Sequence, residues 1–143
     1  LKELDFCLAS IHRAFKMPKE DMTKRICKAI ENRYVNAIAH PTGRLLLERD
    51  SYELDFNKIC KIAHNNNVAL EINAFPNRLD INDNLTKEAI ENKVNITIGT
   101  DSHAKEHLRF LSLGVATARR GWAEKKNILN TLDINKFLNK IKR

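Results

Sequence analysis

The chain has 143 residues, 43% of them hydrophobic and 30% charged, which is enough to bury one core without a disulfide or a structural metal. Its three cysteines show no Cys-x-x-Cys spacing, and no apolar run approaches the roughly 20 residues that cross a bilayer. We therefore expect one cytoplasmic domain over residues 1–143, with reduced thiols and no membrane segment. The formal net charge of +7 favours an anionic partner.

Short β-prone runs alternate along the chain with segments of helical spacing. A short run that is apolar throughout is typical of a buried parallel strand, and strands alternating with helices are typical of an α/β barrel or an open sheet. In both architectures the loops after the strands meet on one face and hold the functional groups. The predicted strands are 8–11, 35–39, 68–70 and 96–100, and the predicted helices between them are 18–33, 54–66 and 85–93.

Helix ends and two further helices follow from capping residues and apolar spacing. Asn84 or Thr86 is expected to cap the helix 85–93, and Asp133 is expected to cap the last helix. Another helix is predicted to begin near Lys105. The predicted apolar faces are Leu108, Leu111, Val115 and Ala118 on the helix from Lys105, and Ile134, Phe137, Leu138 and Ile141 on the last helix.

Chemically versatile side chains stand where the predicted strands end: His12, His40, Glu71, Asp101 and His103. Imidazole and carboxylate groups bind Zn²⁺, Mn²⁺ or Fe²⁺, and the lack of a nearby cysteine argues against a structural thiolate site. Each residue taken alone is more often a hydrogen-bonded or solvated side chain than a ligand. Their repetition at four strand ends predicts a site. The remaining histidines are left outside it: His64 as a surface residue at a helix end, and His107 because Asp101 pairs better with His103.

Two loops are predicted over the same edge of the sheet. One is 40–50, and the other follows the break at Phe75-Pro76-Asn77 as an exposed loop containing Arg78 and Asp80. A guanidinium group matches phosphate oxygens at two points, so arginines are candidate phosphate clamps, although solvation is the alternative for each alone. The candidates are Arg44, Arg78, Arg119 and Arg120.

The basic residues are concentrated near the C-terminus. Between Arg119 and Arg143 there are eight basic and two acidic residues, so most of the net charge lies there. A solvated helix end and a phosphate-backbone contact are both consistent with this stretch.

The strand-end segments together resemble those of the PHP (polymerase and histidinol phosphatase) domain. Segments near the C-terminus, Thr117 to Trp122 and Asn130 to Leu132, resemble the PHP domain of bacterial and archaeal family X DNA polymerases in particular. The likeness covers nearly the whole chain. The strand-end segments are Ala9-Ser10-Ile11-His12, Ala39 to Arg44, Glu71 to Asp80 and Gly99-Thr100-Asp101-Ser102-His103.

The resemblance implies a distorted, TIM-like (β/α)7 barrel that holds up to three divalent ions, often manganese or zinc. It also implies a metal-dependent 3′-to-5′ exonuclease or related DNA-end processing activity in DNA repair. By motif, His12, His40, Asp101 and His103 match metal ligands, with Asp101 and His103 as the expected catalytic pair. Glu71 and Asn73 match a pocket-lining segment that contacts substrate, beside the arginines named above.

The departures from the family pattern are as informative as the matches. The family's opening His-x-His motif and a further His and Glu are absent, so we expect about the C-terminal half of the barrel, as part of a polymerase. The alternatives are a catalytically incomplete fragment that contacts DNA, and a phosphomonoesterase resembling histidinol phosphatase.

Overall fold

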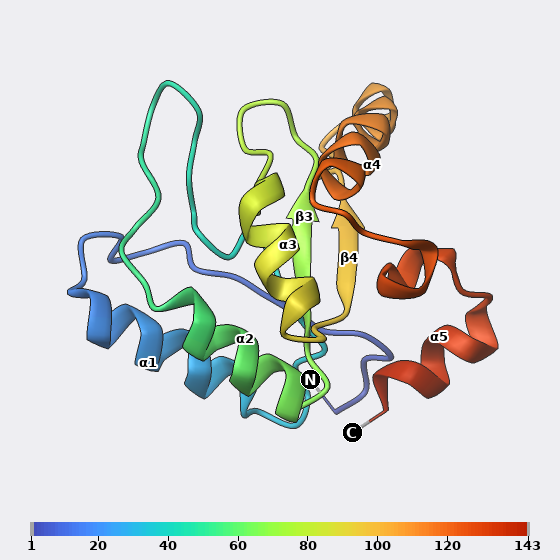
Figure 1. Ribbon diagram of the computed structural model, residues 1–143, viewed down its shortest axis with the longest axis horizontal. Coiled ribbons are helices and arrows are strands. Elements are labelled where there is room, and N and C mark those ends of the chain that lie inside the picture. Colours follow the sequence, from blue (N-terminus) through green and yellow to red (C-terminus); the bar gives the residue numbers. More distant parts are fainter. Residues whose placement is uncertain (1, 143) are drawn as a thin grey trace.

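The computed structural model describes residues 2–142 and shows an α/β arrangement around a four-stranded parallel sheet in the order β1-β2-β3-β4 (Figure 1). Parallel neighbours joined by helical crossovers are what the alternating sequence pattern predicted. The strands are β1 (Leu8–Ala9), β2 (Ala37–Ile38), β3 (Ala69–Asn73) and β4 (Ile96–Gly99); the helices are α1 (Lys19–Ile30), α2 (Phe56–Asn65), α3 (Asp83–Glu91), α4 (Leu111–Arg120) and α5 (Ile134–Ile141), with 3-10 turns η1 (Lys105–Phe110), η2 (Lys125–Asn127) and η3 (Leu129–Thr131).

The strands differ in how deeply they are buried. Every residue of β2 and β3 is buried, because helices or the C-terminal segment cover both faces of the sheet there. The first strand departs from the prediction: Leu8 is exposed and Ala9 is half-buried, since β1 is an edge of this sheet. The third strand is longer than predicted and carries Glu71 within it, so the expectation that Glu71 follows the strand end is wrong.

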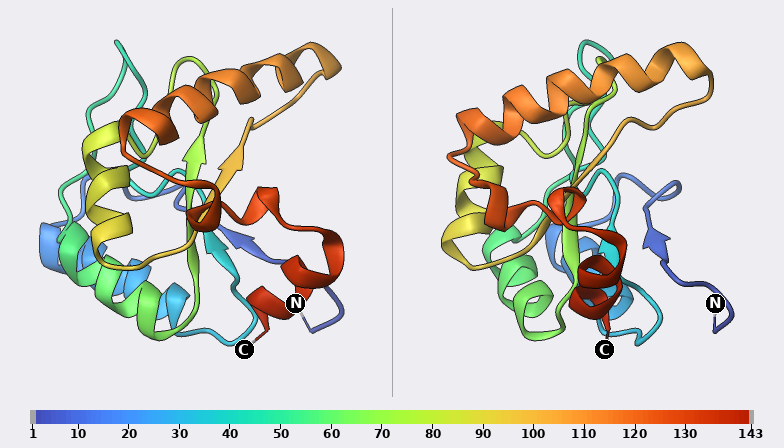
Figure 2. Two further views of the ribbon diagram at one scale, coloured as in Figure 1. Left: turned by 45° about the vertical axis from the view of Figure 1, so that its right-hand side comes forward. Right: turned by 90° about the vertical axis from the view of Figure 1, so that its right-hand side faces the viewer.

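Helices α1, α2 and α3 lie along one side of the sheet, while the segment from η2 to α5 lies on the other (Figure 2). The larger apolar core forms under α1–α3, with Met22, Ile26, Ile59 and Ile72 among its fully buried side chains. A smaller cluster on the opposite face joins Ala37 and Ala69 to Leu129 and Ile141. Both faces of β2 and β3 are thereby shielded from water.

Capping at α3 differs from the prediction. The side chain of Asn82 accepts a hydrogen bond from the Leu85 backbone N–H, so Asn82, not Asn84 or Thr86, is the N-cap. Thr86 is fully buried and its hydroxyl donates to the Asn82 carbonyl. The predicted cap of α5 is confirmed, since Asp133 accepts from the Lys136 backbone N–H.

Helix α4 crosses the carboxyl ends of β3 and β4 and contacts α3 (Figure 2). Its buried positions are Gly114 and Ala118; a Cβ at Gly114 would overlap Ile98 and Ala74. The predicted apolar face is wrong apart from Ala118, because Leu108, Leu111 and Val115 are exposed by 63%, 45% and 43%. Because α4 packs closely against β3 and β4, its contact face carries the small residues Gly114 and Ala118, and its leucines face solvent.

Residues 2–142 include all three cysteines of the chain. Cys7, Cys27 and Cys60 are free thiols, and the last two are buried. In the same part of the chain, no helix combines the length and apolar character needed to cross a membrane.

Candidate active site

Two imidazoles meet at the carboxyl ends of β1 and β2. His12 follows β1 and His40 follows β2, and their rings contact edge to face with centroids 5.3 Å apart. Parallel register explains the meeting, since Ala9 lies opposite Ile38 and both chains leave the sheet at the same edge. His12 is exposed and its Nε2 lies 2.6 Å from Ser10 Oγ.

The His40 ring is uncharged at neutral pH, and one of its nitrogens has no hydrogen-bond partner in the described chain. Burial, with the Arg78 guanidinium nearby, lowers its pKa to about 4, so a lone pair is available at neutral pH. Its Nδ1 is buried and has no hydrogen-bond partner in the described chain. The backbone at His40 is left-handed, with φ of 32°, which is uncommon for a residue other than glycine. A buried nitrogen without a partner marks a position where a ligand can bind.

Glu71 holds the backbone of this site. Its Oε2 accepts a 2.9 Å hydrogen bond from the His40 backbone N–H and lies 3.4 Å from Asn73 Nδ2. Burial raises the pKa of this carboxyl to about 7. The neighbouring strand makes room with Gly99, where a Cβ would overlap the Glu71 carboxylate. Glu71 therefore ties the end of β2 to the middle of β3.

Asp101 stands after β4, where its carboxylate is held from two sides. Arg78 Nε donates to Oδ2 at 3.1 Å and Asn73 Nδ2 donates to the same oxygen at 3.2 Å. Within the described chain, no hydrogen bond to Oδ1 is made, and Arg78 Nη1 is buried without a partner. Asp101 also has left-handed backbone, with φ of 51°. One carboxylate oxygen, Oδ1, and one guanidinium nitrogen, Nη1, are thus without a partner in the described chain.

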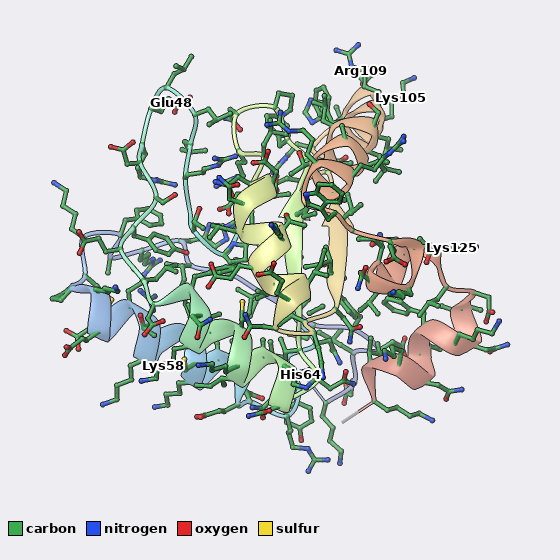
Figure 3. The ribbon with its side chains drawn as sticks, viewed as in Figure 1. Glu48, Lys58, His64, Lys105, Arg109 and Lys125 are labelled. Atoms are coloured by element: carbon green, nitrogen blue, oxygen red, sulfur yellow. The ribbon has the colours of Figure 1, made fainter. Side chains whose placement is uncertain are left out.

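His103 is not part of this group in the structure. Its ring is exposed and its Nδ1 lies 2.7 Å from the Asp101 carbonyl oxygen, so the side chain folds back onto its own loop. Its backbone N–H donates to His107 Nδ1 at 3.2 Å. His64 lies exposed at the opposite end of the molecule from Lys105, as predicted for a surface residue (Figure 3).

The other predicted phosphate-binding arginines lie outside the group. Arg44 donates to the carbonyl oxygens of Arg78 and Leu79 and so fixes the loop after β3. Arg120 on α4 pairs with Asp83 at 2.6 Å, and Arg119 is exposed in the same helix turn.

Asp80 is a residue whose placement the sequence prediction missed. It was expected in an exposed loop, but it is fully buried, with both carboxylate oxygens within 3.3 Å of the Thr42 backbone N–H. Burial raises its pKa to about 6. The one signal in the sequence is apolar Ile81 directly after it, itself fully buried. Asp80 joins the loop after β2 to the loop after β3.

The donor set agrees in chemical type with a divalent ion, because it combines a neutral imidazole, its unpartnered Nδ1 and carboxylates. Among residues 2–142, however, no three His, Cys, Asp or Glu side chains lie close enough together to hold one. The described residues therefore bring fewer than three candidate metal ligands together.

Comparison with known proteins shows which proteins the chain is similar to. The chain is 43% identical over 141 residues to the DNA polymerase/3′-5′ exonuclease PolX of Bacillus subtilis, covering 96% of this chain and 25% of that protein. The chain is a relative of PolX. This confirms the resemblance to the PHP domain of family X DNA polymerases that the motifs indicated.

The PolX-related chain is similar to a second group of proteins as well. It is 36% identical over 110 residues to a probable phosphatase of Acetivibrio thermocellus, covering 72% of this chain and 43% of that protein. A probable phosphatase of Thermoanaerobacter sp. is 29% identical over 146 residues, covering 96% and 57%. No family model matches the chain. The chain thus spans a quarter to little more than half the length of these relatives.

Proposed function

We propose that the chain is the C-terminal part of a PHP-type, metal-dependent phosphoesterase that hydrolyses phosphodiesters at the 3′ ends of DNA. The observation that carries the proposal is the group formed by His40, Arg78 and Asp101, in which two buried nitrogens have no partner in the described chain. Relatives with exonuclease and phosphatase names support it, because both activities hydrolyse phosphate esters.

Under this proposal the four parallel strands are part of a distorted (β/α)7 barrel. The remaining strands and metal ligands would belong to a longer protein that also carries a polymerase domain. The fully parallel order β1-β2-β3-β4 supports a barrel segment, and the much greater length of PolX supports a larger parent protein.

His12, His40, Asp101 and His103 would hold one or more Mn²⁺, Zn²⁺ or Fe²⁺ ions, with Asp101 binding through Oδ1. A bound divalent ion would supply an activated water near neutral pH and neutralise charge on the phosphate. His40 can bind without first losing a proton, since its pKa is about 4. His103 would have to rotate away from the Asp101 carbonyl oxygen.

The chain's own residues position and neutralise the substrate. Arg78 Nη1 is available to donate to a phosphate oxygen while Nε keeps Asp101 in place. Asn73 orients the same carboxylate, and Glu71 orients His40 through its backbone N–H. Glu71 and Asn73 thereby hold the proposed ligands His40 and Asp101 in place.

The experiment compares the chain with Asp101→Ala and with Glu53→Ala, which removes an exposed carboxylate elsewhere, on a 5′-labelled single-stranded oligonucleotide with added Mn²⁺. We expect nucleotide release by the parent chain and by Glu53→Ala, and none by Asp101→Ala. Equal release by all three proteins would refute the assignment of Asp101. If none of them cleaves, the same comparison is made in a full-length PolX-type protein, where loss of both nuclease and polymerase activity would also refute it.

A second candidate is a DNA-contacting segment without its own catalysis. It is favoured by the absence of a three-ligand cluster among residues 2–142 and by the Arg78–Asp101 ion pair. It predicts DNA binding that weakens steeply with salt and is unchanged by EDTA. The third candidate, a small-molecule phosphomonoesterase, is favoured by the phosphatase relatives and predicts faster hydrolysis of histidinol phosphate than of DNA.

A further inference from the structure

Three aromatic rings pack together beside the candidate site. Phe75 meets His107 edge to face at 5.2 Å between centroids, and Phe110 at 5.3 Å. His107 and Phe110 are stacked at 5.4 Å. Phe75 follows β3, whereas His107 and Phe110 lie in η1, so the cluster bridges two segments that both leave the sheet at its carboxyl edge.

Hydrogen bonds connect the ring cluster directly to the site. The Phe75 backbone N–H donates to Asn73 Oδ1 at 3.1 Å, and the Nδ2 of the same amide holds Asp101. On the other side, His107 Nδ1 accepts from the His103 backbone N–H. The rings are therefore fixed relative to the group that would receive a phosphate.

The ring cluster (Phe75, His107 and Phe110) differs from a piece of ordinary core. Its three rings are half-buried, and within the described chain Phe75 and Phe110 pack against neither apolar cluster. Phe6 and Phe137, in contrast, pair at 5.5 Å against the smaller core. A group of partly exposed rings with fixed orientation is costly to leave in water without a partner.

Two cations, Lys105 and Arg109, flank the cluster in η1, together with Glu106, whose carboxylate lies 3.9 Å from Lys105 Nζ. The Arg109 guanidinium lies 5.4 Å from the centroid of the Phe110 ring. Figure 3 shows Lys105 and Arg109 at the outer tip of η1, pointing away from the body of the molecule. Aromatic faces flanked by cations are the combination with which proteins bind single-stranded nucleic acid, since every base offers a face and every linkage a negative charge.

We infer that the ring cluster is a stacking surface for a nucleobase near the 3′ end of a single DNA strand, with Lys105 and Arg109 contacting adjacent phosphates. The inference rests on the proposed phosphoesterase function and specifies its substrate as a polynucleotide. A small phosphomonoester without a base would gain nothing from these rings. The ring cluster therefore favours a polynucleotide substrate, as for the relative named an exonuclease, over a small phosphomonoester.

The test measures binding in EDTA, by fluorescence anisotropy, of a 5′-labelled oligoadenylate of about 12 nucleotides and of the same strand with abasic 3′-terminal positions. The variants are Phe110→Leu, which keeps apolar volume but removes the ring face, and Phe110→Trp, which enlarges it. Phe137→Leu is the control, because it alters a ring pair that packs against the smaller apolar cluster and is no part of the ring cluster.

We expect Phe110→Leu to weaken binding of the oligoadenylate about fivefold or more, and Phe110→Trp to preserve or strengthen it. The abasic strand should bind Phe110→Leu and the parent chain alike. A purely structural role predicts the opposite order, with leucine tolerated and tryptophan harmful. Equal affinity of parent chain and Phe110→Leu for oligoadenylate, or no binding by the parent chain, overturns the inference.

The outcome is independent of catalysis because no metal is present in the binding assay. A chain that cleaves DNA but binds equally well with Phe110→Leu keeps the phosphoesterase proposal and loses the stacking surface. A chain that stacks the base but never cleaves, even within a full-length protein, keeps the stacking surface and loses the phosphoesterase proposal.

Discussion

Individual side chains at the strand ends show where the protein tolerates an energetic cost. His40 Nδ1 and Arg78 Nη1 are buried without partners in the described chain, and each such atom typically costs about 1–3 kcal/mol. Both belong to the group around Asp101, whereas two other buried atoms without a partner in the described chain, the hydroxyl oxygens of Tyr52 and Thr97, lie outside that group. The two unmet hydrogen-bonding atoms beside one carboxylate are the reason to place ligand binding there.

Asp80 gives a prediction on pH. Its pKa rises from 3.8 to about 6 on folding, so between these values the unfolded chain releases a proton that the folded chain retains. The contribution of Asp80 to stability is present below pH 3.8 and is lost as pH rises through 6, a difference of up to about 3 kcal/mol. We expect Asp80→Asn to gain stability relative to the parent chain between pH 4 and pH 7, measured by urea unfolding.

Asp50→Asn, at an exposed position in the same loop layer, is the control for replacing a carboxylate with an amide. A constant difference between Asp80→Asn and the parent chain across this pH range would contradict the assigned cause.

Secondary-structure elements set which residues can reach the site. The two loops after β2 and β3 are joined by Asp80 to Thr42 and by Arg44 to the carbonyl oxygens of Arg78 and Leu79. These hydrogen bonds hold the Arg78 backbone in place while the Arg78 side chain contacts Asp101. A loop held by its neighbour in this way presents a rigid arginine, which improves the precision of phosphate binding.

The cap of α3 gives a prediction with a matched control. Asn82 accepts from the Leu85 backbone N–H at 2.9 Å, so Asn82→Ala should lower the free energy of unfolding by about 1 kcal/mol. Asn84→Ala changes an exposed residue within the same helix and should be close to neutral. Urea unfolding midpoints of the two variants test this. A larger loss at Asn84 would restore the cap expected from the sequence.

The exposed face of α4 gives a further prediction, on stability. Leu111→Ser should change the free energy of unfolding by no more than about 0.5 kcal/mol, since that side chain is 45% exposed. Ala118→Leu should destabilise by about 1–3 kcal/mol, because Ala118 is buried. Thermal unfolding of the two proteins is the measurement. Strong destabilisation by Leu111→Ser would mean that the leucine face is covered in solution.

For the molecule as a whole, the C-terminal end of the basic stretch lies away from the candidate site, whereas Arg119 and Arg120 at its start lie on α4, which crosses the carboxyl ends of β3 and β4. The basic C-terminal stretch expected to contact phosphates ends in α5, which Figure 1 shows below the sheet and away from the carboxyl ends of the strands. Lys105 and Arg109 lie at the opposite, upper end. A DNA end that approaches Asp101 therefore meets Lys105 and Arg109 before the basic residues of α5.

This separation predicts a difference between surfaces of equal charge. Lys105→Ala/Arg109→Ala should reduce the slope of log affinity for single-stranded DNA against log salt by about 1 or more. Lys136→Ala/Lys140→Ala, which removes the same charge from α5, should leave the slope nearly unchanged. Titrations from low to moderate salt provide the measurement. The reverse result would assign the phosphate contacts to the C-terminal stretch.

The sequence by itself determined the alternation of strands and helices, the cap at Asp133 and the appearance of His12, His40 and Asp101 at one edge of the sheet. These depend on hydrophobic period, capping residues and the rule that parallel strands share a carboxyl end. The tertiary structure alone decided the partners: Glu71 bonds to a residue 31 positions away, and Thr42 to an aspartate 38 positions away. It also decided the orientation of α4, because close packing at Gly114 outweighed the leucine pattern. Local spacing cannot encode such contacts, since they depend on how separate elements meet in space.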